Sequence, residues 1–520
     1  MAGVTSYPKT TIQLLPAAIV TAFAERNDLI TGQLGTGATA TDGALNTNVQ
    51  SLSEAELRIL FGDDHLYNTI IKYNSGNDGY TPLSVIGLDA SGTGVAATGS
   101  IAFTGTSTSA GTYTISCADE DYDLTVAVPS GTAAADVAIL VTAAYTALAA
   151  SDYPPFVVTE ATVTNTFTAS DVGTIGNHYS LEIDGTIAGL TYVLTGFASG
   201  ANDPVLTTLF DPIGGLRFTS ILWPENWSAS VDEVTDLLDE RFNPSNDILD
   251  GVAFMGYSDT YANDLSFVSS LNSQSLVVAG NNKVTADSIK GSAILQSADY
   301  TMAYFMGVES KRLTTGAPLA SDIVAVNAPL DAIGGPHLAS LPLFNTPLSQ
   351  TPVTSSVNLF SNTEQGALST AGFTTFGVNR ALNGMIMGAV VTTRTTDTAG
   401  NVNDSFRFLN YVRTGSVCRE IFFNTLKATF AQSRLADGNA RPGYSVANAE
   451  TILAELATIY RTLSEAVLVE SGDVAEQYFA NNTTITLAKS SRSVTITSLL
   501  PIVTQLETIN YPLTLSFSIE

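Results

Sequence analysis

Residues 218–224 read Phe-Thr-Ser-Ile-Leu-Trp-Pro, a short apolar run that stops at a proline. A run of this length is typical of a buried strand. Ser228 follows as a candidate cap for a helix, and apolar residues then recur at helical spacing from Val231 to Phe242. Two more apolar runs, 250–255 and 275–279, are the next strand candidates. Strands that alternate with helices predict an α/β layer in the middle of the chain.

The segment from about 90 to 198 has a different texture, because threonine, serine, glycine and alanine dominate it. Alternation of apolar and polar residues predicts strands at 100–104, 111–116, 123–128, 156–158 and 164–168. Thr132 is a candidate cap for a helix to about 150, with apolar residues on one face. We therefore expect a compact α+β module inserted into a longer chain.

The last third predicts a mixture of helices and strands. Residues 385–393 are typical of a strand, and a long amphipathic helix is expected over 406–436, ended by Asp437-Gly438. Ser445 opens the next expected helix. Strands are expected at 483–487 and 494–497.

The C-terminus ends on a strict period of two. Leu513, Leu515, Phe517 and Ile519 alternate with small hydroxyl residues, which predicts a strand up to the last residue. A strand must pair its backbone groups. This one either completes a sheet of its own chain or is donated to a neighbour.

The first 25 residues predict an extended arm, since they contain Pro8 and Pro16 and have little helical period. The apolar positions that we single out in the arm are Ile12, Leu14, Ile19 and Val20. The stretch loosely imitates a signal peptide, but Pro16 and its polar neighbours argue against that interpretation. No run of about 18 apolar residues occurs anywhere, so the sequence predicts no membrane-spanning helix.

Composition limits the partners. The chain has 520 residues, enough for two to four domains. Only 13% are charged, so much of the surface can be buried against another copy at low desolvation cost. The net charge of −28 argues against wrapping nucleic acid and against anionic membranes. The two cysteines, Cys117 and Cys418, are expected to be reduced in a protein made in a cytoplasm.

A search for catalytic or metal-binding groups finds none. His65, His178 and His337 stand in unrelated contexts without metal-ligand spacing. The sequence has no phosphate-binding or nucleophile motif, and we expect no cofactor. Trp223 and Trp227 are interpreted as core residues. We predict a protein that is not an enzyme.

Several weak motifs occur in a recognisable order. They are 130–134 (Ser-Gly-Thr-Ala-Ala), 176–181 (Gly-Asn-His-Tyr-Ser-Leu), 341–343 (Leu-Pro-Leu), 393–396 (Thr-Arg-Thr-Thr), 400–401 (Gly-Asn) and Asp404. In this order, and followed by a helical pair and a terminal strand, they resemble the Mu-like branch of myophage tail sheath proteins over nearly the whole chain.

The resemblance implies an α+β protein of nested domains. An inner sheath domain (371–507) is built with the N-terminal arm (1–25). A middle domain (26–90 and 199–370) is inserted into it and carries an outer insertion domain (91–198). Residues 508–520 form the strand that the resemblance assigns to a neighbouring subunit.

The resemblance also implies a role: a virion subunit, assembled in the host cytoplasm, that stacks as hexameric rings around a tail tube protein and contracts. Baseplate and tail terminator proteins are the further partners implied. Arg394, Arg413 and Arg419 are candidates for contacts with the tube or a neighbouring subunit, with solvated surface positions as the alternative. Two rivals remain open: the sheath of a contractile bacteriocin or secretion apparatus, and a secreted adhesin or glycan-binding protein.

Overall fold

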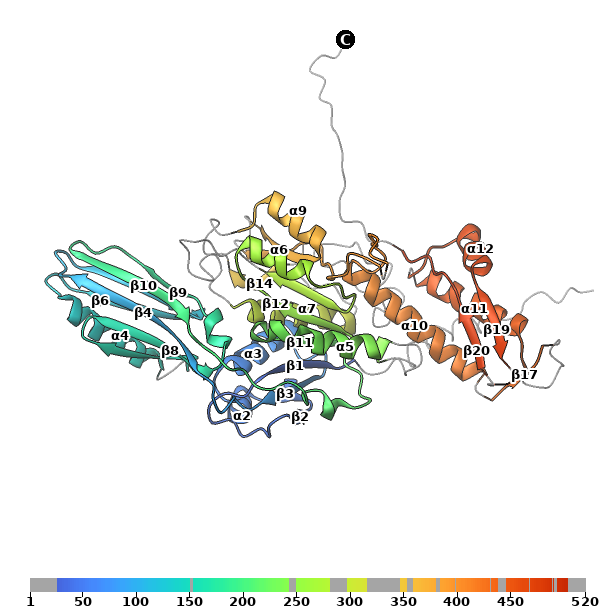
Figure 1. Ribbon diagram of the computed structural model, residues 1–520, viewed down its shortest axis with the longest axis horizontal. Coiled ribbons are helices and arrows are strands. Elements are labelled where there is room, and N and C mark those ends of the chain that lie inside the picture. The colour runs from blue at the N-terminus through green and yellow to red at the C-terminus, as the bar shows by residue number, and fades with distance from the viewer. Residues whose placement is uncertain are drawn as a thin grey trace, which may run out of the picture.

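A central sheet organises the chain in the computed structural model (Figure 1). The structure describes residues 26–149, 153–242, 249–280, 297–315, 347–352, 359–379, 384–397, 399–430, 432–437, 446–466, 468–488, 490 and 493–503. The sheet has nine strands in the order β14-β16-β15-β13-β12-β11-β1-β3-β2. Their bounds are β1 Asp28–Gln33, β2 Leu45–Asn46, β3 Leu83–Leu88, β11 Ser220–Trp223, β12 Val252–Gly256, β13 Leu276–Gly280, β14 Pro347–Pro352, β15 Phe373–Asn379 and β16 Gly384–Met387.

The six inner strands run parallel, from β15 across to β3, and antiparallel strands close both edges. Five of them, β13 to β3, are buried along their whole length, as expected for parallel strands that need cover on both faces. The predictions of strands at 218–224, 250–255 and 275–279 are confirmed as β11, β12 and β13.

Helices cover the two faces of the central sheet and build two separate cores. On one face lie α2 Glu54–Phe61, α3 His65–Asn77 and α7 Ala298–Thr315. On the other lie α5 Val231–Phe242, α6 Tyr261–Ser269 and α9 Asn362–Ala371. The helix expected near Ser228 is α5, which begins at Val231 because a 3-10 turn, η5 Glu225–Ser230, precedes it. Trp223 and Trp227 are core residues, as predicted.

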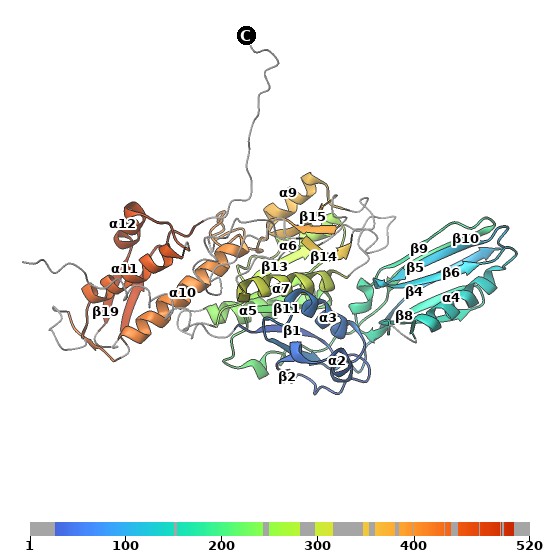
Figure 2. The same ribbon diagram turned by 180° about the vertical axis from the view of Figure 1, so that it is seen from behind.

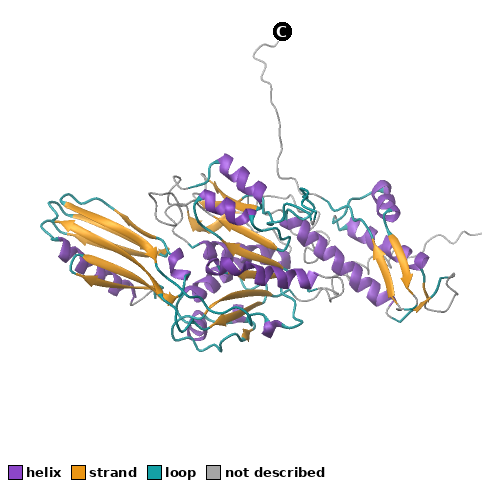
Figure 3. Cartoon of the chain, in the orientation of Figure 1, coloured by secondary structure: helices purple, strands orange, loops and turns teal. Residues whose placement is uncertain are grey.

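Between β3 and β11 the chain leaves the sheet and forms a module that Figure 3 shows to be mostly strand. One sheet has the order β10-β4-β8-β7 and another has the order β6-β5-β9. The bounds are β4 Ala96–Gly105, β5 Gly111–Cys117, β6 Asp119–Val128, α4 Ala134–Ala149, β7 Phe156–Ala161, β8 Thr164–Val172, η3 Ile175–His178, β9 Leu181–Asp184 and β10 Leu190–Ala198. The strands and the helix expected in this segment are confirmed, but the helix begins at Ala134, and the hydroxyl of Thr132, expected as its cap, donates to the Pro129 carbonyl oxygen at 2.8 Å.

After the central sheet, α10 Leu409–Phe430 leads into a small C-terminal body with a core of its own. Its other elements are β17 Arg434–Leu435, β18 Val446–Ala447, α11 Ala449–Glu465, α12 Asp473–Asn481, β19 Thr484–Ala488 and β20 Ser493–Thr497. The last two confirm the expected strands at 483–487 and 494–497. Figures 1 and 2 show the module, the central body and this C-terminal body in a row.

Three expectations for the last third are wrong. Residues 384–387 alone form a strand where 385–393 was expected, because the chain then turns away and Val391 makes only an isolated bridge. The long helix ends at Phe430, before Asp437-Gly438, since Arg434 and Leu435 pair with β18. The next helix is capped by Asn448 rather than Ser445, through a capping box with Thr451.

The boundary expected at 371 also differs from the structure. β15 and β16 lie beyond it, yet both pair within the central sheet. The chain therefore stays in the central body past that point. The other domain bounds stay predictions. No helix in the described ranges is long and apolar enough to span a bilayer.

The crossing of α3 and α7 provides a test of the packing. A Cβ on Gly307 would lie 2.3 Å from the Tyr73 carbonyl oxygen, and a Cβ on Gly76 would lie 2.5 Å from that of Tyr304. We expect Gly307→Ala to lower the free energy of unfolding by about 1–3 kcal/mol, because the two backbones must separate. Urea denaturation measures this effect.

The matched control is Gly366→Ala in α9, where a Cβ meets nothing within 4 Å. This variant should be neutral or more stable by about 0.5–1 kcal/mol. Equal effects of the two substitutions would contradict the close helix crossing.

Candidate functional site: two joints between three bodies

The helix α10 belongs to two cores at once. Leu409 and Val412, near its start, are buried in the core of the central body. Val417 and Ile421, further along, are buried in the core of the C-terminal body. A continuous helix that is packed at both ends joins the two bodies as a rigid rod.

Arg413 fixes this helix to the central body. Its side chain is 5% exposed. Nε and Nη2 donate to the two carboxylate oxygens of Glu309 at 2.8 and 3.0 Å, and Nη1 donates to the Thr219 carbonyl oxygen at 2.6 Å. The guanidinium thus connects α10 with α7 and with the start of β11. Such a buried, bidentate pair has both a strict geometry and a strong charge-assisted bond.

A second arginine completes the α10 joint. Arg217 Nη1 donates to Glu420 Oε2 at 2.7 Å, and its Nη2 lies 3.7 Å from Asp250 Oδ1. The hydroxyl of Ser416, on α10, donates to the same aspartate. Two arginines from different segments are therefore matched by three carboxylates inside one small volume.

The root of the N-terminal segment lies in this joint as well. Burial, and then the nearby cation Arg413, lower the pKa of Arg26 to about 10, while Glu309 acts in the opposite direction. Arg26 is the first described residue and stands two positions before β1. The chain before it therefore enters the structure beside α10.

The three arginines singled out from the sequence have different environments. Arg413 is buried and paired with Glu309 within the chain, so it has no solvated surface position in the described structure, and its contact with a tube or a neighbour stays a prediction. Arg394 is half-buried and donates to Gln274 Oε1 at 2.7 Å. The Arg419 guanidinium lies 4.4 Å from the ring centroid of Phe242. For Arg394 and Arg419 an intersubunit role stays a prediction.

The remaining candidates lie outside the described residues. They are the arm positions Ile12, Leu14, Ile19 and Val20, and the strand positions Leu513, Leu515, Phe517 and Ile519. Their predicted roles remain untested, and His337 also lies outside the described ranges.

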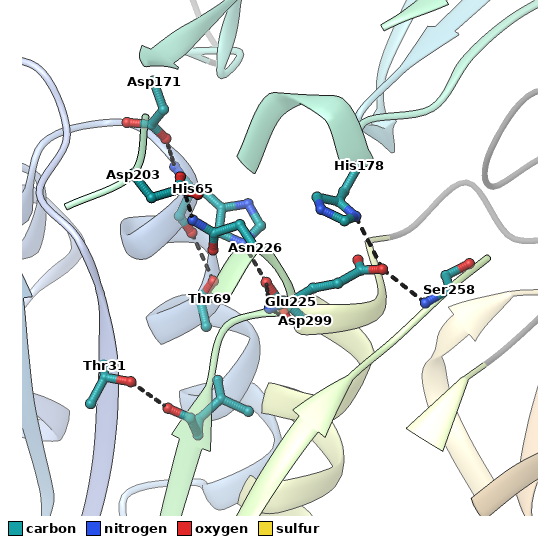
Figure 4. A network of polar contacts seen from close by, with 11 residues as sticks. Thr31, His65, Thr69, Asp171, His178, Asp203, Glu225, Asn226, Ser258 and Asp299 are labelled. Atoms are coloured by element: carbon teal, nitrogen blue, oxygen red, sulfur yellow. Dashed lines mark hydrogen bonds and ion pairs between the residues drawn. The ribbon is translucent and has the colours of Figure 1, made fainter. Parts of the chain in front are cut away.

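A second joint holds the module on the central body, and sequence reasoning missed it. His65 begins α3 and His178 ends η3, yet both lie in one buried polar network (Figure 4). His178 Nδ1 is 3.0 Å from Glu225 Oε1, across the boundary between module and body. His65 Nε2 is 3.1 Å from Asp299 Oδ2, and its backbone N–H donates to Asp171 Oδ2 of the module at 3.0 Å.

Further contacts tighten the module joint. The Gln33 amide, at the end of β1, donates to the carbonyl oxygen of Val172 at 2.9 Å. The His65 ring stacks on Tyr300 with centroids 4.8 Å apart, and the Tyr179 ring lies 6.0 Å away on the module side. The module is therefore held by side-chain contacts in addition to its two chain connections.

A small pocket lies beneath this joint, at the carboxyl ends of β1 and β11. There the strand order reverses, because β3 follows on one side of β1 and β11 on the other. Open α/β sheets bind ligands at such switch points. Here the module supplies Asp171 and Ile175 to the lining. Among the described residues, no group of three or more histidine, cysteine, aspartate or glutamate side chains could hold a metal ion.

The hairpin of β19 and β20 is a two-stranded sheet of the C-terminal body. In the described part of the structure these strands pair only with each other. Ile485, Leu487, Val494 and Ile496 pack on the core of the C-terminal body but stay half-buried. A two-stranded sheet is marginally stable, and its edges offer unpaired backbone groups.

No family model matches the chain. The Mu-like prophage FluMu tail sheath protein of Haemophilus influenzae is 24% identical to it over 445 residues, which make up 84% of this chain and 83% of that protein. The solved sheath tail protein of Desulfitobacterium hafniense is 13% identical, with a TM-score of 0.44 over 97% of this chain and 100% of the other. A sheath tail protein of Listeria innocua is 11% identical, with a TM-score of 0.47 over 96% of both chains.

The described chain thus consists of three bodies in a row, fixed to one another by buried polar contacts and a shared helix. The sequence similarity to the Haemophilus protein bears out the resemblance stated above: over most of its length the chain is similar to a Mu-like prophage tail sheath protein. That relative is a sheath protein, which agrees with the expectation that this chain is not an enzyme.

The α10 joint can be tested by removing one partner of its buried ion pair. We expect Arg413→Met to lower the free energy of unfolding by about 3–5 kcal/mol, because Glu309 is left buried without its cation. The double variant Arg413→Met/Glu309→Met should recover most of this loss. Urea denaturation followed by circular dichroism measures both variants.

An exposed ion pair of the same residue types is the control. Arg461 is bonded to Glu476, and its side chain is 64% exposed. Arg461→Met should change stability by less than about 1 kcal/mol. If Arg413→Met also changed the free energy of unfolding by less than about 1 kcal/mol, the α10 joint would depend on packing and not on its charges.

Proposed function

We propose that the chain is the subunit of a contractile bacteriophage tail sheath. It stacks as hexameric rings around a tail tube, assembles in the host cytoplasm and becomes part of the virion tail. Contraction of the stack drives the tube through the host envelope. The observation that carries this proposal is the sequence relationship to a Mu-like tail sheath protein over most of both chains.

The path of the chain supports the nested plan that we propose, apart from the boundary at 371. The central sheet begins with β1, is interrupted between β3 and β11 by the module, and is followed by the C-terminal body. In the proposed sheath the C-terminal body faces the tube and the module faces outward.

The β19–β20 hairpin is the proposed receptor for a strand from a neighbouring subunit. Its apolar residues alternate on one face, and residues 513–519 have the same period of two. Strand addition would give the hairpin the backbone partners that it lacks among the described strands. Alternating apolar side chains would set the register.

The chain has enough length to reach such a neighbour. Val503 is the last described residue and is held by a hydrogen bond from its N–H to the Leu468 carbonyl oxygen, 3.2 Å long. Residues 504–512 can span at most about 30 Å when extended. That distance is comparable with the diameter of a small domain. The strand can therefore be delivered to an adjacent copy.

The N-terminal arm provides the other connection in the proposal. The arm joins the described part of the chain at Arg26, which lies in the α10 joint. A pull on the arm would act on the same joint that holds the C-terminal body. Each subunit could then rotate as a rigid unit while its two ends stay paired with neighbours.

The work of contraction would come from the lattice itself. The sequence has no nucleotide-binding motif. An extended lattice that relaxes to one with larger buried interfaces is a bistable rigid-body transition, and it needs no hydrolysis.

Deletion of residues 511–520 tests the proposed strand donation. We expect the truncated protein to stay folded but to form no sheath-like polymer in electron micrographs, because each hairpin lacks its added strand. Circular dichroism checks the fold of the truncated chain. Normal polymers from this variant would reject the donated strand.

A matched pair of point variants tests the register of that strand. Phe517→Asp places a charge on the apolar face, and we expect at least a tenfold loss of polymer in a sedimentation assay. Ser518→Asp places the same charge on the opposite face and should leave polymerisation unchanged. If both variants polymerise equally, the alternation has no role in assembly.

Genomic neighbours separate the phage sheath from the sheath of a bacteriocin or secretion apparatus, because capsid genes accompany only the first. Gel filtration separates either sheath from the adhesin predicted as a rival. The adhesin predicts a monomer at every concentration, whereas the sheath predicts assembly.

A further inference from the structure

The contact between module and central body is rich in groups that bind protons. We call this contact the seam. Charged and titratable side chains lie at it on several elements: Arg58 on α2, Asp63, Asp64 and His65 at the start of α3, Tyr153 before β7, Asp171 on β8, His178 and Tyr179 at η3, Asp203 after β10, Glu225 on η5, and Asp299 and Tyr300 on α7.

Two aspartates meet across the seam. Asp171 of the module and Asp64 of the body are within hydrogen-bonding contact through their carboxyl groups. Their other oxygens are engaged, since Asp64 Oδ2 accepts from the Thr36 N–H at 2.7 Å and Asp171 Oδ2 accepts from the His65 N–H at 3.0 Å. Two buried carboxyl groups in contact cannot both be charged at low cost, so they share a proton.

Imidazoles face the other carboxylates of the seam. His178 reaches Glu225 from the module, and Glu225 also accepts from the Ser258 N–H at 2.8 Å. His65 reaches Asp299, whose carboxylate also accepts from the Glu225 N–H at 2.9 Å. No lysine or arginine is among the groups that act most on Asp64, Asp171 and Asp299 within the described structure. Bound protons are therefore what neutralises these three carboxyl groups, whereas the more exposed Asp63 pairs with Arg58 at 3.4 Å.

We propose that the seam is a proton-operated latch: docking of the module takes up protons, so the module is held more firmly at mildly acidic pH than at alkaline pH. The proposal concerns the hold of one part of the chain on another. It stands whether or not the chain assembles into a sheath.

The direction follows from the linkage between proton binding and docking. Burial, and then the neighbouring Asp64, raise the pKa of Asp171 well above its ordinary value, and burial also raises the pKa of Asp64 and of Asp299. The docked state then binds more protons than an undocked state at pH values between the ordinary and the raised pKa. Docking is strongest below this window and weakens as pH rises through it.

Hydrogen exchange of the full chain, read by mass spectrometry, tests the latch. Protection of peptides that cover η3 is compared at about pH 5.5 and about pH 8, after correction for the intrinsic rate, with peptides of β5 as an internal reference. Each unit by which a seam pKa is raised corresponds to a tenfold change in the docking equilibrium. We expect η3 protection to fall at least tenfold at the higher pH while β5 stays protected.

Asp171→Asn is the decisive variant, because an asparagine amide mimics the protonated acid: its oxygen accepts from the His65 N–H and its NH2 donates to Asp64. We expect this variant to keep η3 protected at pH 8 and to lose most of the pH dependence. Glu160→Gln removes a charge at an exposed position of strand β7 in the same module and should behave like the wild type.

A pH-independent η3 in the wild type would overturn the proposal. A wild-type pH slope in a folded Asp171→Asn would overturn it as well. Should Asp171→Asn lose the protection of β5 and thus fail to fold, Asp64→Asn neutralises the same pair from the side of the central body. A wild-type slope in that variant would also overturn the latch, and a flat profile would support it.

Discussion

Five consecutive strands of the central sheet, from β13 to β3, are buried along their whole length, and this constraint decides where other parts of the molecule can attach. Helices must cover both faces, so neither face can receive an additional body. What remains are the ends of the strands and the helix α10. The module docks at the carboxyl ends of β1 and β11, and the C-terminal body is attached through α10. The elongated arrangement in Figure 1 follows from that limit.

The two joints hold their bodies by different means. The α10 joint combines a shared helix with buried arginine–carboxylate pairs. At the module joint the carboxyl groups of Asp64 and Asp171 meet without an arginine or lysine, and the proposed latch uses the proton bound there. In the proposed sheath subunit the first joint lies between the tube-facing body and the central body. A buried joint with bidentate geometry suits a part that must transmit force without changing shape.

Much of the fold could be predicted from local patterns. Apolar runs located β11, β12 and β13, because a strand buried on both faces is apolar along its length. Alternation located the strands of the module, because a strand buried on one face has an apolar residue at every second position. The errors fall where tertiary contacts decide. The helix α10 ends at Phe430 because the following residues pair with β18. A helical pattern also could not reveal that Arg413, on a half-polar helix, is enclosed by α7 and β11.

The candidate site was less accessible to sequence reasoning. His65 and His178 are far apart in the chain and have no metal-ligand spacing, so nothing local connects them. Only the docking of the module brings His178 to Glu225 and Asp171 to the N–H of His65. The one signal available was the polar sequence at the start of α3 and at η3, which also fits an ordinary turn. The strand and arm positions, in contrast, were singled out from alternation alone, and the β19–β20 hairpin now offers a surface that such a strand would fit.

The position of β1 in the sheet has a consequence for biosynthesis. This strand is made early, yet it lies between β3 and β11, and β11 leaves the ribosome only after the entire module. During that delay the nascent chain carries one apolar strand edge without its partner, a state that exposes surface prone to aggregation. Contacts within the module join residues that are closer in sequence than β1 and β11 are. The module can therefore fold first, while the central sheet is still incomplete. Translation speed through the module thus sets how long the growing protein stays vulnerable.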